Sequence, residues 1–329
     1  MTKKISLLGP NSGTTTKPGE QSFAETLRSL ERLAPEGSKP DAIVFIDFDN
    51  DPAEKIDSHP GASPNGLIRQ EPRVVRPQNY RPDFLSQMSF VIDVGRPPGT
   101  SSSRVNWPQN WNLKILHLSQ SDSPVRIDKT VMINRNLMSF VDGEMYSLRR
   151  LLAQRSSEID VWGMGWQMPF IKKAIRVIEE LIIPIRHGFP VKLSSVRGWF
   201  KSPLSYKGPS EDKLATLANY KYSLVVENSL DYMSEKLFDC FFAGTLPIYV
   251  GPNPRAFGIP EFAVIHSKPN IESVLESIDL ARGVNLDEWR SSVLAWLSSE
   301  GVEQMWSGPY VLKQILEKVD TELAAIKNA

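Results

Sequence analysis

The chain has 329 residues, of which 41% are hydrophobic and 23% charged, and its 38 basic and 38 acidic residues give a formal net charge of zero. A chain of this length can form two domains of ordinary size, each with its own core. Nucleic acids and anionic membranes favour a basic excess in their partners, so the balanced charge argues against either as the main partner.

Cysteine content and the first residues bear on the cellular location. The single cysteine, Cys240, excludes an intrachain disulfide, which fits a reducing compartment. The opening MTKKISLLGP has too short an apolar run for a signal peptide, and no segment approaches the roughly 20 apolar residues of a membrane helix. We expect a soluble, cytoplasmic protein, with peripheral association at the inner face of the membrane left open.

Strand-like and helix-like segments alternate along the chain. The strand-like runs are IVFIDFD (43–49), SFVIDVG (89–95), NLKILHLS (112–119) and KTVMINRN (129–136), and a polar loop is expected at 51–66. Helical spacing follows in GEMYSLRRLLAQRS (143–156) and in KKAIRVIEELIIPI (172–185), which is expected to end at Pro184. This alternation predicts a parallel α/β architecture.

The alternation runs through both halves of the chain, which predicts two α/β domains. We expect an N-terminal domain over 1–155 and a C-terminal domain over 156–300. The last segment, 301–329, has helical character and is expected to pack back on the N-terminal domain.

The segment YSLVVENSLDYMSEKLFDCFFAGTLPIYVG (222–251) predicts a strand, a polar loop, a helix and a second strand. Ser234 is in a position to cap the helix, and Gly244 to end it. In a β-α-β unit of this kind nucleotides bind beyond the strand end, and the free N–H groups at a helix start favour a pyrophosphate. Helix capping and solvation are the alternative roles of Glu235 and Lys236.

The longer string YKYSLVVENSLDYMSEKLFDCFFAGTLPIYVGP (220–252) resembles the donor-site motif of the alpha-1,3/4-fucosyltransferases, glycosyltransferase family ten, bacterial type. It reproduces their pattern of Tyr-Lys-aromatic, Glu-Asn-Ser, Tyr-x-x-Glu-Lys, Ala-Gly-Thr-x-Pro and Gly-Pro. The preceding SYKGPSEDKLATLANYKY (205–222) is similar to the family's approach to that motif. The resemblance implies a GT-B-like fold, with two Rossmann-like domains facing across a cleft and GDP-fucose on the C-terminal one.

The resemblance also implies a set of donor-binding residues. They are Glu227, Asn228, Tyr232, Ser234, Glu235 and Lys236. A family arginine that meets the phosphates corresponds to a position in MINRNLMSFVDGEMYSLRRLL (132–152), where either Arg149 or Arg150 qualifies; we favour Arg149 as a catalytic residue and keep Arg150 as donor-binding. Asn134 fits the family pattern as a fold position.

An inverting transfer needs a carboxylate that deprotonates the acceptor hydroxyl while cations hold the leaving diphosphate. The resemblance points to Glu71, in EPRVVRP, although Pro72 follows it directly and so shifts the proline spacing; Asp93 is the alternative base. A competing interpretation makes Asp47, Asp49 and Asp51 ligands of a divalent metal. We expect no metal ligand set, no required cofactor and no essential divalent metal.

The expected function is inverting transfer of fucose from GDP-fucose to a hydroxyl of a glycan, in an alpha-1,3/4 linkage, in glycan biosynthesis such as protein glycosylation. The expected partners are GDP-fucose and an oligosaccharide or lipid-linked glycan, without nucleic acid. A transferase for another GDP-sugar and a non-catalytic GDP-sugar binding protein remain as alternatives, the second because of the shifted proline beside Glu71.

Overall fold

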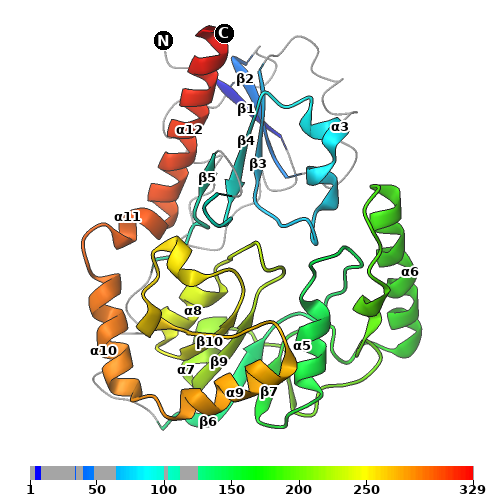
Figure 1. Ribbon diagram of the computed structural model, residues 1–329, viewed down its shortest axis with the longest axis vertical. Coiled ribbons are helices and arrows are strands. Elements are labelled where there is room, and N and C mark those ends of the chain that lie inside the picture. The colour runs from blue at the N-terminus through cyan, green and yellow to red at the C-terminus, as the bar shows by residue number, and fades with distance from the viewer. Residues whose placement is uncertain are drawn as a thin grey trace. The chain divides into compact units, whose positions relative to one another are not determined.

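A computed structural model describes residues 4–8, 34, 40–47, 64–99, 103–111 and 125–328 of the chain (Figure 1). The chain divides into two compact units, the first formed by Met1–Trp111 with Glu303–Ala329 and the second by Asn112–Val302. The boundary therefore follows Trp111. The sequence had led us to expect it after residue 155, and that prediction is wrong. Residues after 111 join the second unit because the strand Ile127–Ile133 pairs within its sheet.

The first unit is built on a parallel five-stranded sheet in the order β1-β2-β3-β4-β5. Its strands are β1 (Ile5–Leu8), β2 (Ala42–Ile46), β3 (Asn65–Arg69), β4 (Phe90–Val94) and β5 (Arg104–Val105). The sequence predicted β2 and β4, whereas β3 begins within the polar loop expected at 51–66 and was not predicted. Between β3 and β4 lie the 3-10 helix η1 (Pro77–Tyr80) and the short α3 (Pro82–Leu85).

Helix α12 (Gly308–Asn328) brings the end of the chain back to this first sheet, as the sequence predicted. Its buried side chains, among them Val311 and Ile315, pack with Val44 of β2 and Ile92 of β4 in one apolar cluster. Phe45, on the opposite face of β2, packs in a second cluster with Phe84 of α3 and others. Burial on both faces explains why these strands read as continuous apolar runs. The short α11 (Val302–Trp306) precedes α12.

The second unit has a parallel six-stranded sheet in the order β11-β10-β9-β6-β7-β8. Its strands are β6 (Ile127–Ile133), β7 (Ile159–Trp162), β8 (Tyr206–Gly208), β9 (Tyr220–Val226), β10 (Leu246–Val250) and β11 (Ile265–His266). The chain adds β7 and β8 on one side of β6 and then returns to add β9 to β11 on the other. This is the strand order of a dinucleotide-binding Rossmann fold.

Helices connect these strands. They are α5 (Tyr146–Ala153), α6 (Phe170–Arg186), η2 (Leu193–Val196), α7 (Lys213–Ala218), α8 (Lys236–Ala243), η3 (Pro254–Phe257), η4 (Glu261–Ala263), α9 (Ile271–Arg282) and α10 (Leu286–Leu297). Gly244 ends α8 in the left-handed conformation at φ 64°, as the sequence predicted. Helix α6 continues through Pro184 to Arg186, two residues beyond its expected end.

The start of α8 differs from the sequence prediction. Its N-cap is Glu235, in helical conformation and without a side-chain cap, and not Ser234. The hydroxyl of Ser234 donates to the carboxylate of Glu227, 2.8 Å away. This hydrogen bond ties the loop to the end of β9. None of the helices in the described part of the chain is both long and apolar enough to cross a bilayer.

Candidate functional site: the carboxyl end of β9

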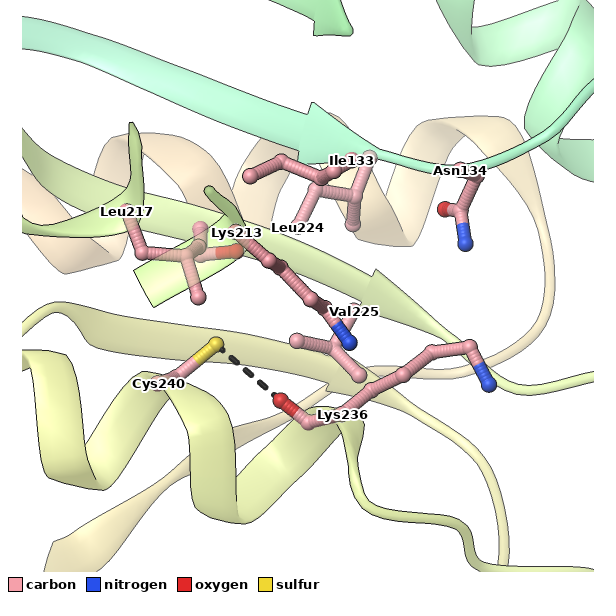
Figure 2. Close-up of a pocket in the computed structure, with 9 residues that line it drawn as sticks. Ile133, Asn134, Lys213, Leu217, Leu224, Val225, Lys236 and Cys240 are labelled. Carbon is pink, nitrogen blue, oxygen red and sulfur yellow. Dashed lines mark hydrogen bonds between the residues drawn. The ribbon is translucent and has the colours of Figure 1, made fainter. Parts of the chain in front are cut away.

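The switch in strand order falls between β6 and β9, and ligands of open α/β sheets bind beyond the strand ends at such a point. A small pocket lies there (Figure 2). Its lining includes Asn134 after β6, Lys213 from α7 and Lys236 from α8. In Figure 2 the polar ends of these three side chains lie toward the ends of the strands, with Leu217 and Cys240 at the other end of the pocket.

Glu227, the first residue after β9, organises the loop that follows. Its side chain is fully buried, and its carboxylate accepts from the backbone N–H of Ser234 at 3.0 Å and from the Ser234 hydroxyl. Lys236 Nζ lies 3.2 Å from Oε2 of Glu227, the oxygen that also accepts from the Ser234 hydroxyl. A buried carboxylate requires such partners, so Glu227 holds the loop and the ammonium in place from inside the protein.

Gly251, the first residue after β10, lies against the side chain of Glu227. A Cβ at this position would lie 2.3 Å from the Tyr249 hydroxyl and 2.9 Å from Cγ of Glu227. A larger residue here would therefore displace the Tyr249 side chain and crowd that of Glu227.

Arg149 reaches the same strand end from α5. Its guanidinium donates to the carbonyl oxygen of Val226, the last residue of β9, at 3.0 Å and to Oδ1 of Asn228 at 2.9 Å. Burial lowers the pKa of Arg149, and the nearby Tyr146 and Glu227 oppose that effect. Arg149 and Asn228, both predicted from the sequence, are thus in direct contact.

Lys213 is a cation of this site that the sequence analysis missed. It forms ion pairs with Glu235, at 3.3 Å, and with Asp239 of α8. Burial lowers the pKa of Lys213, but the two carboxylates outweigh it and raise the pKa overall. Burial in turn raises the pKa of Glu235, while Lys213 and Lys236 lower it to a net value below its ordinary range. The segment 205–222, which resembles the fucosyltransferase approach to the motif, contains Lys213 and was the available signal.

Arg150 and Tyr232 do not join this group. The guanidinium of Arg150 donates to the carbonyls of Arg197, at 3.1 Å, and of Leu137, at 2.5 Å, and also to that of Ser195. Arg150 is 1% exposed, so it serves to tie α5 to the η2 segment. The side chain of Tyr232 is 1% exposed and belongs to the core below the loop.

The carboxyl edge of the sheet in the first unit holds the two predicted bases and a further carboxylate. Asp93, at the end of β4, is buried and makes a two-point ion pair with Arg69, at 2.7 and 2.8 Å. Glu71, two residues after β3, is half-buried; its carbonyl accepts from the Tyr80 hydroxyl at 3.0 Å.

Asp47 lies directly after β2, beside Glu71. It is fully buried, and its backbone is left-handed at φ 46°, which is uncommon outside glycine. Its carboxylate accepts from Nδ2 of Asn79 at 2.7 Å and from the backbone N–H groups of Gln70 and Glu71. Burial, with the negative charge of Glu71 as a second cause, raises the pKa of Asp47 to about 7. The negative charge of Glu71 therefore favours the protonated form of Asp47.

Metal binding was the competing interpretation of Asp47, Asp49 and Asp51. Asp49 and Asp51 lie outside the residues that the structure describes. Over the described ranges, no group of three or more His, Cys, Asp or Glu side chains is arranged to hold a metal ion.

No protein-family model matches the chain. An alignment over 104 residues, which covers 29% of this chain, is 30% identical to the alpha-(1,3)-fucosyltransferase FucT of Helicobacter pylori. The match spans 21% of that protein, about a fifth of its length. The resemblance to fucosyltransferases predicted from the motif is confirmed over this segment.

Solved structures share the fold of the whole chain. A crystal structure of an alpha1,3-fucosyltransferase aligns with a TM-score of 0.52 and 15% identity over 98% of this chain and 90% of that chain, and its counterpart with GDP-fucose with a TM-score of 0.51 and 14% identity over the same shares. A UDP-forming trehalose-phosphate synthase from Burkholderia xenovorans reaches 0.52 at 12% identity, over 93% and 78% of the two chains. The two Rossmann-like units are thus those of a GT-B-like fold. Equal scores for enzymes with different donors mean that the fold does not select the nucleotide.

Proposed function

We propose that this chain is an inverting glycosyltransferase that moves fucose from GDP-fucose to a hydroxyl of a glycan acceptor. The observation that carries the proposal is the set of cationic side chains around one strand end. Arg149, Lys213 and Lys236 come from three different helices and meet at the switch point of a Rossmann sheet. The start of α8 adds backbone N–H groups, which favour a diphosphate.

In the proposed mechanism the cations act on the leaving group. As the bond between fucose and GDP breaks, negative charge grows on the β-phosphate, and Lys236 and Arg149 stabilise that charge from fixed positions. Glu227 holds Lys236 in place because the Glu227 side chain is fully buried and its carboxylate is therefore fixed beside the ammonium. Asn228 does the same for Arg149 through its amide oxygen. Arg150 has no such role in the proposal, since its guanidinium is directed to the carbonyls of Leu137, Ser195 and Arg197 and not to the end of β9.

The proposed base is Glu71, which takes the proton from the acceptor hydroxyl as that oxygen attacks the anomeric carbon opposite GDP. Transfer with inversion needs one carboxylate for this step. Asp93 is the weaker candidate because Arg69 engages both of its oxygens. The diphosphate is neutralised by side chains, so the proposal includes no divalent metal.

Fucose is favoured over other GDP-sugars by the motif and by the Helicobacter pylori relative. The alpha-1,3/4 linkage follows from the same resemblance, and a glycan is the proposed acceptor class. A transferase for another GDP-sugar is the second candidate, and a GDP-sugar binding protein without turnover is the third.

The test is a donor screen with the purified chain. GDP-fucose, GDP-mannose, UDP-glucose and UDP-galactose are incubated with and without a mixture of oligosaccharide acceptors, and nucleotide release is measured together with the mass of the acceptors. We expect GDP release from GDP-fucose and a product heavier by one deoxyhexose. Transfer from GDP-mannose alone would support the second candidate, and binding of GDP without release from any donor the third.

A further inference from the structure

Helix α6 carries an apolar stripe on the side turned away from the core of its own unit. The stripe is formed by Ile171, Ile175, Ile178, Ile182 and Ile185, which are 72%, 51%, 62%, 53% and 62% exposed. Other side chains of α6 (green in Figure 1), those of Val177 and Leu181, pack against Met138, Phe140 and Trp199. The core of the unit therefore does not need the stripe, and a row of five half-exposed isoleucines marks an interaction surface.

The spacing of the five isoleucines is that of a coiled-coil seam. They recur at intervals of four, three, four and three residues, so they occupy the a and d positions of a heptad repeat. A repeat of this kind fits a second helix, whose own a and d side chains can interlock with it, although Phe170 at the start of α6 is also exposed.

The charged side chains beside the stripe favour an antiparallel over a parallel partner helix. The e positions hold Lys172, Glu179 and Arg186, whereas the g positions hold only Ala174 and Leu181. In a parallel pair e faces g, which leaves the three charges without complementary partners. In an antiparallel pair e faces e, which allows opposite charges to meet across the two copies.

One antiparallel register satisfies both the seam and the charges. When Ile175 of one copy packs on Ile178 of the other, Ile171 packs on Ile182, and Lys172 faces Glu179 twice, once on each side of the two-fold axis. A shift by one heptad would place Glu179 against Glu179 and Lys172 against Arg186. The favoured register also ends before Pro184, the residue that interrupts the helical hydrogen-bond ladder.

We propose that α6 is a self-association surface, on which a second copy of this chain packs its own α6 antiparallel through the isoleucine stripe. The interface is isologous, since the same residues contribute from both copies, and the two-fold symmetry closes it as a dimer. Glu179 is 57% exposed and its partner Arg176 lies 3.5 Å away within the same helix, so its carboxylate is accessible to Lys172 of the second copy.

Sedimentation velocity over a wide range of protein concentration tests this proposal. The wild-type chain is expected to form a dimer, and Ile178→Glu to weaken it by about a hundredfold or more, because the substitution buries an unpaired charge in the seam. The fold tolerates this change because Ile178 is exposed, which circular dichroism checks. Leu280→Glu, at a position on α9 that is 67% exposed, is the matched control and keeps the wild-type dimer.

Charge exchange tests the register. Lys172→Glu and Glu179→Lys each convert two attractive pairs into repulsive ones and are expected to weaken the dimer by about tenfold, and the double exchange to restore it. A wild-type chain that stays monomeric at every concentration overturns the proposal, as does a double exchange that fails to restore the dimer. Monomers that float with phosphatidylglycerol vesicles, and lose this in Ile178→Glu, overturn it in favour of a lipid surface.

Discussion

The carboxyl edges of the two sheets handle buried charge in different ways. In the second unit, the buried Glu227 accepts hydrogen bonds from Ser234 and lies beside the ammonium of Lys236. In the first unit, the buried Asp47 accepts from amides, those of Asn79 and of the backbone, and has the carboxylate of Glu71 as a neighbour. At one edge the buried Glu227 thus has a lysine beside it, in a group whose cations suit a phosphate, whereas at the other the buried Asp47 has a second carboxylate beside it, an arrangement that suits proton transfer.

This difference predicts that Glu227 is the more costly carboxylate to remove. Glu227→Ala leaves the Lys236 ammonium, 16% exposed, without its carboxylate and removes the partner of Ser234, so the free energy of unfolding should fall by about 4 kcal/mol. Differential scanning calorimetry measures the loss. The control is Glu235→Ala, at the same helix start but 42% exposed, which should lower stability by less than about 1 kcal/mol. Equal losses in the two variants would mean that Glu227 does not organise the site.

Asp47 should make the first unit less stable as pH rises. Its pKa is raised from an ordinary 3.8 to about 7, so between these values the unfolded chain has released the proton while the folded chain still holds it. The contribution of Asp47 to the free energy of unfolding is then fully present below about pH 4 and is lost as pH rises through 7. We expect this loss to be about 3 kcal/mol, allowing for relaxation of the site. In Asp47→Asn the side chain keeps its shape, and asparagine also adopts the left-handed backbone conformation. This variant should lack the pH-dependent contribution when denaturation is measured as a function of pH. A variant with the same pH profile as the wild type would show that Asp47 does not titrate in this window.

Substitution of the two candidate bases of the first unit should have different effects, on the rate of transfer for Glu71 and on stability for Asp93. Glu71→Gln should lower fucosyl transfer by about 100-fold with stability and GDP affinity kept, since an amide cannot accept the proton. Asp93→Asn should instead lower stability, because Arg69 loses its two-point partner. Steady-state kinetics and calorimetry on both variants measure this. Wild-type turnover in Glu71→Gln with slow turnover in a folded Asp93→Asn would move the base to Asp93.

The smallest effect expected is that of metal removal. Since Arg149, Lys213 and Lys236 lie around the strand end where the diphosphate is proposed to bind, transfer should proceed at an unchanged rate after dialysis against EDTA. The matched variant is Asp49→Ala, at a position of the competing metal interpretation. Loss of activity in both experiments, with recovery on adding Mn²⁺, would replace the side-chain account by a metal-dependent one.

The sequence predicted the second unit better than the first because its signals there are local. Gly244 ends α8 through its own backbone freedom, and the apolar run of β9 reads directly as a buried strand. The domain boundary was misplaced because the segment from 112 to 155 has the same alternation as its neighbours, and only strand pairing between β6 and β9 reveals which sheet it joins.

Within the site, what a residue contacts was harder to predict than where it lies. Arg149 and Arg150 are adjacent in sequence, and only the phase of α5 directs one to the end of β9 and the other to the η2 segment. Lys213 pairs with Glu235, 22 residues further along the chain, and no local sequence pattern predicts that pair. Tyr232 and Ser234, expected to bind the donor, are 1% and 2% exposed, and the Glu227 carboxylate accepts from the backbone N–H and the hydroxyl of Ser234, contacts that the sequence did not predict.

The most direct test of the account is a calorimetric titration of GDP into the wild-type chain and into Lys236→Met. The account predicts that the wild type binds GDP and that Lys236→Met binds it about tenfold or more weakly, since a hydrogen bond from a charged group to a phosphate is lost. Lys201→Met, at an exposed lysine of the same unit, is the control and should bind as the wild type does. Equal affinity of Lys236→Met and the wild type, or no binding of GDP by the wild type, would contradict a nucleotide site at the end of β9.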